Sequence, residues 1–232
     1  MTPVWLLIPG MLNDSRVWED VVAGLKHQAL IRIADVRTQT SMAEMARDAW
    51  SLVKDVPKEA PLYLAGFSMG GYVAIEMLNQ PARDLQGLAL LSTSGLGETS
   101  EGRLQREKTI VAMQNDFPKA LEGVLKWNTH QPSPEFLEYL RNMMQAVGLA
   151  TAVRQIRAIS QRHEYRPMLE HLHLPVRVLC GAHDRVIPQQ RSEELAHWIP
   201  GEQLHVVPGA GHMLPMEQPQ AVVDAMLALM NH

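Results

Sequence analysis

Residues 64–78, "LAGFSMGGYVAIEML", are the stretch that decides the fold. Apolar residues lead up to Gly66, Ser68 stands between Gly66 and Gly70, and an apolar pattern of helical period follows. A continuous apolar run of this length is typical of a strand that is buried on both faces. A sharp turn from strand to helix lifts the serine hydroxyl above the sheet, and only glycine at positions 66 and 70 leaves room for the bend. The stretch indicates either an ordinary tight turn or an exposed, strained serine.

Short apolar runs alternate with segments of helical period along most of the chain. The runs predict strands over 4–9, 29–36, 61–67, 85–93, 175–180 and 203–208, and the periodic segments predict helices over 16–27, 42–56, 69–80, 188–198 and 218–231. Ser41 is the expected N-cap of the helix at 42–56, with Glu44 completing a capping box. This alternation predicts an α/β fold, a doubly wound and mostly parallel sheet of about six strands with helices on both faces.

The alternation stops after the fourth strand. Residues 98–166 contain helical patterns, at 101–115, 117–127, 134–146 and 148–162, but no convincing strand. Connections between a strand and the next helix usually have only about 2–6 residues. We therefore expect a core formed by residues 1–97 and 167–232, with residues 98–166 inserted as a helical cap.

The composition excludes several classes of protein. The chain has 232 residues, 46% of them hydrophobic, and its net charge of −4 gives no reason to expect a nucleic acid or an anionic membrane as partner. No apolar run approaches the roughly 18 residues that span a bilayer, and the N-terminus lacks the basic residues of a signal peptide. The single cysteine, Cys180, stands in an apolar run, which predicts a buried thiol and fits a reducing compartment. The cytoplasm is the expected location.

Two further polar residues follow predicted strands. Asp184 comes after the fifth strand, in "GAHDRVIP" (181–188), and His212 comes after the sixth, in "PGAGHMLPMEQP" (208–219). In an open parallel sheet, ligands gather at the carboxyl ends of the strands. A serine hydroxyl becomes a good nucleophile when a histidine removes its proton and an acid orients that histidine. The order Ser68, Asp184, His212 therefore predicts a nucleophile, an orienting acid and a general base.

Three stretches, "GFSMGG" (66–71), "GAHDRVIP" (181–188) and "PGAGHMLPMEQP" (208–219), make this protein resemble the α/β-hydrolase superfamily, and the resemblance covers essentially the whole sequence. The resemblance implies a catalytic triad of Ser68, His212 and Asp184. It also implies an oxyanion hole formed by the backbone N–H groups of Met11 and Met69, and it implies no cofactor.

The chain departs from the family pattern at two places. The loop after the first strand often reads His-Gly in the family, whereas Pro9 and Gly10 stand here. The family's sheet usually begins with an antiparallel hairpin, for which there is no room before Val4. We therefore expect a trimmed sheet of six parallel strands.

Simpler roles for the acidic residues stay open. Asp184 can cap the helix that follows it, since aspartate is a preferred N-cap residue. Asp35, at the end of the second strand, is expected to stabilise a loop. Glu217 is expected either to support His212 from behind or to place a charge at a helix N-terminus.

The remaining histidines, methionines and arginines suggest no cofactor. His183 and the pair His171 and His173 lack a third ligand at a spacing typical of metal sites, so we expect no metal. The methionines are expected to fill the core and an adaptable apolar pocket. Four arginines of the cap, Arg154, Arg157, Arg162 and Arg166, are expected to form a solvated face, with an anionic substrate or a carrier protein as the alternative.

The sequence as a whole predicts a serine hydrolase that cleaves a small carboxylic ester through an acyl-enzyme intermediate. Lactonases, C–C bond hydrolases and perhydrolases share the same triad and remain alternatives; C–C hydrolases often place Trp after the histidine, where Met213 stands here. A protein of this fold that binds a ligand without turnover is the alternative from another class. The expected partner is a small-molecule ester, either free or linked to a carrier protein, and the cap carries no motif that specifies it.

Overall fold

The structure is a computed structural model that describes residues 1–202 and 204–231. Its sheet contains β1 (Val4–Ile8), β2 (Leu30–Ile33), β3 (Leu62–Phe67), β4 (Gly87–Leu91), β5 (Val176–Gly181) and β6 (Leu204–Val207). The strands lie in the order β2-β1-β3-β4-β5-β6, and every neighbouring pair is parallel. The predicted α/β class and the six parallel strands are confirmed. Gln203, which the sixth predicted strand includes, lies outside the described residues.

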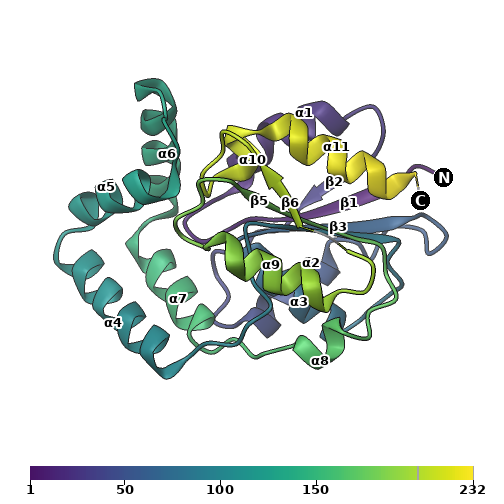
Figure 1. Cartoon of the computed structure of the whole chain (residues 1–232), viewed down its shortest axis with the longest axis horizontal. Coiled ribbons are helices and arrows are strands. Elements are labelled where there is room, and N and C mark those ends of the chain that lie inside the picture. The colour runs from purple at the N-terminus through teal and green to yellow at the C-terminus, as the bar shows by residue number, and fades with distance from the viewer. Residues whose placement is uncertain (203, 232) are drawn as a thin grey trace.

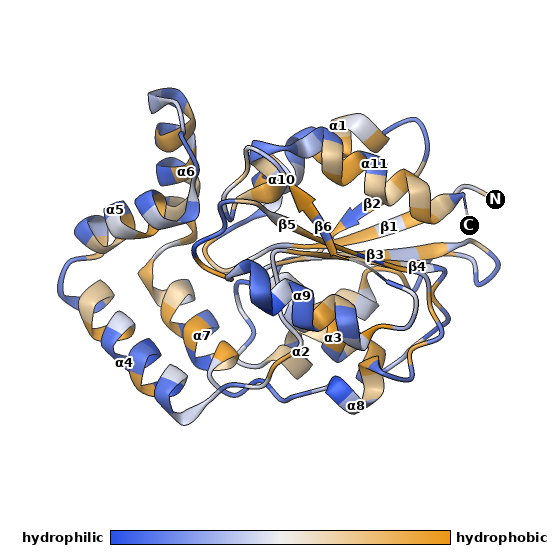
Figure 2. Ribbon diagram, in the orientation of Figure 1, coloured by the Kyte–Doolittle hydropathy of each residue, from blue (hydrophilic) through white to orange (hydrophobic). Residues whose placement is uncertain are grey.

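Helices cover both faces of the sheet (Figure 1). They comprise α1 (Glu19–Leu25) and α11 (Pro219–Met230) on one face, and α2 (Met42–Ser51), α3 (Met69–Asn79) and α9 (Gln189–Trp198) on the other. Trp5 and Leu7 of β1 belong to the core cluster under α1 and α11, whereas Leu6 and Ile8 belong to the cluster under α2 and α3. Because side chains alternate along a strand, a strand covered on both sides must be apolar throughout. Figure 2 shows these hydrophobic strands between the helices, with the edge strand β2 as the more hydrophilic exception.

Several element boundaries differ from the sequence predictions. The predicted helix at 16–27 is a 3₁₀ turn, η1 (Ser15–Trp18), followed by the short α1, and the helix predicted to reach residue 56 ends at Ser51. The strand predicted over 29–36 has only the four residues of β2, which is an edge strand and pairs only with β1. The short helices α8 (Arg166–Leu169) and α10 (Leu214–Glu217) were not predicted, because four residues are too few for a helical period to be visible.

The predicted capping box is only half formed. The hydroxyl of Ser41 accepts a hydrogen bond from the backbone N–H of Glu44 (3.2 Å), as an N-cap should. The carboxylate of Glu44, however, accepts from the backbone N–H of Thr40 (2.7 Å) and from its hydroxyl (2.8 Å), one residue before the N-cap.

Between β4 and the short α8, which precedes β5, lie four longer helices: α4 (Ser100–Asn115), α5 (Phe117–Asn128), α6 (Pro134–Val147) and α7 (Leu149–Ile159). They lie together at one end of the sheet, on the left in Figure 1. Buried residues from these helices, such as Met113, Leu121 and Met143, join the same core cluster as α1 and α11. The segment is therefore packed onto the core. Among the described residues, no helix is both long enough and apolar enough to cross a membrane.

Candidate active site

Ser68 follows β3 directly and is held in a strained turn. Its φ of 52° lies in a region that residues other than glycine rarely adopt, at a cost of about 1–3 kcal/mol. A Cβ atom on Gly66 would lie 2.4 Å from the carbonyl oxygen of Gly70, and one on Gly70 would lie 2.0 Å from that of Ile8. The Thr93 hydroxyl donates to the carbonyl of Ser68 (2.8 Å) and fixes the turn from the side of β4. The serine is thus the strained residue, not part of an ordinary turn.

The side chains of Ser68, His212 and Asp184 form one hydrogen-bonded chain. His212 Nε2 lies 2.9 Å from Ser68 Oγ, and His212 Nδ1 lies 2.9 Å from Asp184 Oδ2. The His212 side chain is 4% exposed and the Asp184 side chain is completely buried. Such a chain can hold the imidazole with its Nδ1–H toward the carboxylate, which leaves Nε2 free to take the serine proton.

Asp184 is held in place by its own loop. Its Oδ1 accepts hydrogen bonds from the backbone N–H groups of Val186 and Ile187, both at 2.9 Å. The helix that follows, α9, begins only at Gln189, and Pro188 is its N-cap. Asp184 is therefore not the cap of that helix, and its second oxygen is directed at His212.

Two free backbone donors flank Ser68. Met11 and Met69 line the same cavity as Ser68, and neither of their backbone N–H groups donates a hydrogen bond to another described residue. Met69 is the first residue of α3, where backbone N–H groups are unpaired and the helix dipole favours negative charge. The loop that carries Met11 is fixed by the buried Gln155 of α7, whose Oε1 accepts from Leu12 N–H (2.9 Å). Gln155 was not predicted, because no local motif marks a residue that acts from another helix.

The C-terminal end of α5 is hydrogen-bonded to the loop that carries His212 and to the loop that carries Asp184. The carbonyl of Asn128 accepts from the backbone N–H groups of His212 (2.9 Å) and Met213 (3.2 Å). Arg185, next to Asp184, donates to the carbonyls of Thr129 (3.0 Å) and Lys126 and lies over the ring of Trp127 at 5.2 Å. The helical segment and the two loops therefore form one packed unit.

Glu217 completes this junction. Its two carboxylate oxygens accept from the backbone N–H groups of His130 (2.7 Å) and Gly211 (2.9 Å), so one side chain joins the segment after α5 to the residue before His212. Burial raises the pKa of Glu217, and these backbone donors counteract only part of that shift. Glu217 thus supports the histidine turn, and it also places a carboxylate in the first turn of α10, so both of its expected roles are confirmed.

Among the described residues, the histidines other than His212 form no cluster that could hold a metal ion. The ring of His183 stacks on that of His130 with the ring centroids 3.6 Å apart. Cys180 is buried as predicted, and burial, with a smaller contribution from the charge of Asp184, raises the pKa of its thiol to about 11.

Of the four cap arginines that were expected to face solvent, two are exposed and two bond to other parts of the protein. A solvated role is wrong for Arg154, which donates to the carbonyl of Arg37 (2.7 Å), and for Arg162, which pairs with Glu98 (2.6 Å) and is 11% exposed. Arg157 and Arg166 are exposed. Asp35 accepts from the backbone and side chain of Arg37 and so stabilises its own loop, as expected.

A cavity of about 750 Å³ opens in front of Ser68 and His212, within the range of small-molecule sites. Most of its wall is apolar and comes from Met11, Phe67, Met69, Tyr72, Ala112, Met113, Ala120, Val124, Trp127, Ile159, Val186, Ile187 and Met213. Its polar lining is concentrated on one turn of α4, with Gln105, Arg106, Lys108 and Thr109, besides Asn13 and Asn128. The cavity can thus enclose a largely apolar molecule with a polar end.

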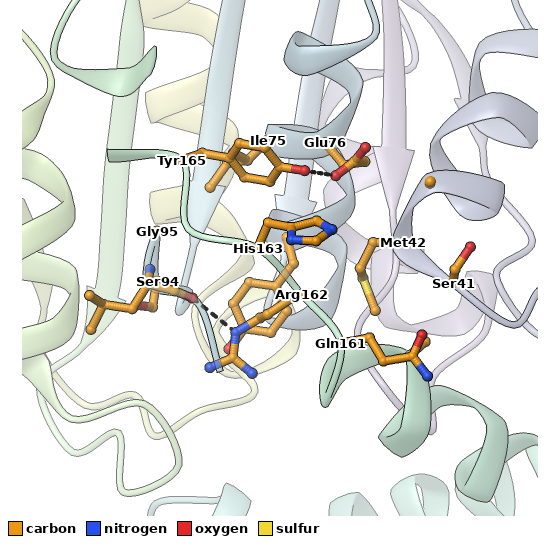
Figure 3. A pocket seen from close by; sticks show the side chains of 14 residues that line it. Ser41, Met42, Ile75, Glu76, Ser94, Gly95, Gln161, Arg162, His163 and Tyr165 are labelled. Atoms are coloured by element: carbon orange, nitrogen blue, oxygen red, sulfur yellow. Dashed lines mark hydrogen bonds between the residues drawn. The ribbon is translucent and has the colours of Figure 1, made fainter. Parts of the chain in front are cut away.

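A second pocket, of about 120 Å³, lies between α2, α3 and the chain after α7 (Figure 3). Its polar groups already have protein partners: the Tyr165 hydroxyl donates to the Glu76 carboxylate, and Arg162 Nε donates to the carbonyl of Leu96 (3.0 Å). It is small and contains neither Ser68 nor His212. The larger cavity is therefore the candidate active site.

Comparisons with known proteins agree with this fold. The sequence model described as "Alpha/beta hydrolase family" matches residues 5–225. The dihydrolipoyllysine-residue acetyltransferase component of the acetoin cleaving system of Pseudomonas putida is 29% identical over 74% of this chain, which spans 46% of that protein's length. The 3-oxoadipate enol-lactonase 2 of Acinetobacter baylyi is 28% identical over 72% of this chain and 62% of its own. A thermophilic esterase from Thermogutta terrifontis superposes with a TM-score of 0.86 at 24% identity, covering 100% of this chain and 90% of its own.

Proposed function

This chain belongs to the alpha/beta hydrolase family, and on that premise we propose that it is a serine hydrolase that cleaves a carboxylic ester of modest size. The observation that carries the proposal is the hydrogen-bonded chain of Ser68, His212 and Asp184 at the floor of a largely apolar cavity. Ser68 is the proposed nucleophile, His212 the general base and Asp184 the acid that orients the imidazole.

The proposed reaction has two halves. Ser68 Oγ attacks the carbonyl carbon while His212 Nε2 takes its proton, and His212 then gives that proton to the departing alkoxide. Water, deprotonated by the same nitrogen, next attacks the acyl carbon; the bond from that carbon to Ser68 Oγ breaks, His212 returns the proton to Oγ, and the acid is released. In both halves the backbone N–H groups of Met11 and Met69 donate to the developing oxyanion, a contribution of about 3 kcal/mol for each such donor.

The helical segment is proposed to act as the cap that selects the substrate. Support for this role comes from α4 and α5, which contribute much of the cavity wall through residues such as Thr109, Val124 and Trp127. A small-molecule ester is the proposed substrate, and the proposed reaction needs water and groups of this chain but no cofactor.

A lactone is the second candidate substrate. It is a cyclic ester and follows the same two halves, except that the alkoxide stays attached to the acyl group. The similarity to a 3-oxoadipate enol-lactonase over 72% of this chain favours testing it. No observation of the site favours C–C bond cleavage over ester hydrolysis.

Burst kinetics test the proposal. With p-nitrophenyl acetate and substrate in excess, we expect about one equivalent of p-nitrophenol per active site, followed by slower steady turnover. Ser68→Ala should abolish both phases. Unchanged turnover in Ser68→Ala would refute the proposal, and binding of esters without any turnover by the wild type would favour the non-catalytic alternative. A pH-stat assay with a set of lactones, run in parallel, decides between open and cyclic esters.

A further inference from the structure

We infer that the substrate carries a carboxylate away from its scissile ester and that this carboxylate pairs with Lys108 of α4. The inference rests on the proposed function, because it specifies the substrate of the same site. Three observations support it: polar side chains of α4 line the cavity, the cavity wall has a net positive charge, and most of the remaining wall is apolar.

Helix α4 has its polar side turned toward the cavity. Gln105, Lys108, Thr109 and Ala112 line the cavity, and their spacing of three and four residues places them on one helical face. The core-facing side of the same helix is apolar, since Ile110 and Met113 are buried, and Leu104 and Val111 are 67% and 54% exposed. The polar side chains therefore stand on the flank of α4 that borders the cavity, beside its apolar inner side. A polar group of a bound molecule would find its partners on this flank.

The cavity wall carries net positive charge. Among the described residues that line it, Arg106 and Lys108 are charged at neutral pH and none is Asp or Glu. Arg106 forms an ion pair with Glu98, which also pairs with Arg162 (2.6 Å). Burial alone would raise the pKa of Glu98, but its bonds to the two arginines lower the pKa overall, so the carboxylate is ionised. These three groups therefore sum to one positive charge.

Lys108 adds a second positive charge and is the cation available to a ligand. It has no ion-pair or hydrogen-bond partner for its ammonium group within the part of the chain that the structure describes. Arg106, by comparison, is already bonded to Glu98. This excess of cations stands in a chain whose net charge is −4.

The rest of the wall defines the remainder of the substrate. Beyond α4 it is mostly apolar, with Met11, Phe67, Met69 and Met213 among the residues that line it together with Ser68, so the group between the ester and the carboxylate should be apolar. An exposed ion pair is weak, and partial enclosure by a bound ligand strengthens it. A preference of about tenfold for a charged substrate is the effect to expect.

Matched ester pairs test the inference. The first pair places the charge on the acyl side, as mono-p-nitrophenyl adipate against p-nitrophenyl hexanoate; the second places it on the leaving group, as 4-acetoxybenzoate against phenyl acetate. The readout is the ratio of the two kcat/KM values within a pair, so that any general change in activity cancels. Spontaneous hydrolysis of each ester is subtracted from its rate.

The wild type should prefer the charged ester about tenfold in at least one pair, and 0.5 M KCl should reduce that preference because salt screens exposed charges. Lys108→Ala should bring the ratio close to one and Lys108→Glu should invert it. Lys119→Ala is the matched control, since Lys119 is an exposed lysine of α5 that does not line the cavity, and it should keep the wild-type ratio.

Two outcomes overturn the inference: equal kcat/KM values within both pairs for the wild type, or an unchanged ratio in Lys108→Ala. The same assays with Ser68→Ala separate this failure from that of the proposed function. Hydrolysis that depends on Ser68 but shows no preference for charge overturns the inference alone. Hydrolysis that does not depend on Ser68 overturns the proposed function itself.

Discussion

The loops at the carboxyl end of the sheet and the helical segment α4–α7 differ in how much freedom their side chains have. In the loops, a Cβ atom at Gly66 or Gly70 would lie within 2.4 Å of a backbone oxygen, and each oxygen of Asp184 has a partner. In the helical segment, Lys108 and Trp127 line an open cavity and are exposed. The loops thus fix the positions of the reacting groups, whereas side chains of α4 and α5 that face only the cavity can change without disturbing them; Asn128 and Gln155, which bond to the loops, are the exceptions.

The largest effect is expected at the centre of the loop region. Ser68→Ala should lower kcat for p-nitrophenyl acetate by about 10⁶-fold, the loss typical of removing the nucleophile of a serine hydrolase. KM for any residual reaction should change little, because the cavity wall is intact. Steady-state assays with active-site-titrated wild type as reference measure this, and a loss of less than tenfold would contradict the nucleophile assignment.

Asp184→Asn is the next largest change. The amide keeps the shape of the side chain, but with its oxygen accepting from Val186 and Ile187 N–H, its NH₂ group faces His212 Nδ1 and can only donate, so the wrong tautomer of His212 is favoured. A loss of about 10⁴-fold in kcat is expected, with the fold retained. Circular dichroism together with kinetics checks both parts. Asp35→Asn is the control, because the carboxylate of Asp35 bonds only within its own loop. An equal loss of kcat in this variant would show that the effect is not specific to the hydrogen bond between Asp184 and His212.

Glu217→Gln tests the junction between the two regions. The glutamine amide offers one acceptor where His130 N–H and Gly211 N–H need two, so one buried donor loses its partner. We expect kcat to fall about tenfold, more than KM changes, and the melting temperature to fall by a few degrees. Glu193→Gln, an exposed carboxylate of α9, serves as the control for a simple loss of charge. An unchanged kcat in Glu217→Gln would mean that the junction does not position His212.

Trp127→Ala should affect binding more than chemistry. The indole forms part of the cavity wall, is 55% exposed and contacts the guanidinium of Arg185. Its loss should raise KM for a p-nitrophenyl ester of medium chain length about fivefold, with a smaller change in kcat. Stability should change by less than about 1 kcal/mol, because little apolar area is buried there. A fall in kcat larger than the rise in KM would contradict the division between the two regions.

The smallest effect is expected at Cys180. With a pKa raised to about 11, its buried thiol is almost fully protonated at pH 8, and thiolate is the reactive form. The sign of the shift means that reactivity should increase as the pH rises toward 11. Iodoacetamide at pH 8 should therefore leave the native enzyme unmodified and fully active, and should alkylate the thiol only after denaturation. Rapid alkylation of the native protein, followed by mass spectrometry, would show that β5 is less well buried than the structure indicates.

The sequence predicted the parallel sheet well, because buried parallel strands are continuous apolar runs and the glycines around Ser68 have a strict geometric reason. It also placed Ser68, Asp184 and His212 at one edge of the sheet, where the structure joins them in one hydrogen-bonded chain. Their catalytic roles, and the boundaries of the cap at 98–166, stay predictions.

What the sequence missed depends on contacts between distant segments. Gln155 fixes the loop of Met11 from α7, and Asn128 binds the histidine turn through its backbone carbonyl, a group that every residue has. Neither role leaves a local pattern. The solvated face predicted for Arg154 and Arg162 was wrong for the same reason, since their partners, the carbonyl of Arg37 and the carboxylate of Glu98, are far away in the chain.

Covalent labelling tests the central claim most directly. The wild type is incubated with a fluorophosphonate, and the intact mass and the modified peptide are determined beside Ser68→Ala and His212→Ala. We expect one adduct on Ser68 in the wild type, none in Ser68→Ala and strongly slowed labelling in His212→Ala. An adduct on another residue, or equal labelling with and without His212, would contradict the claim that the imidazole activates this hydroxyl.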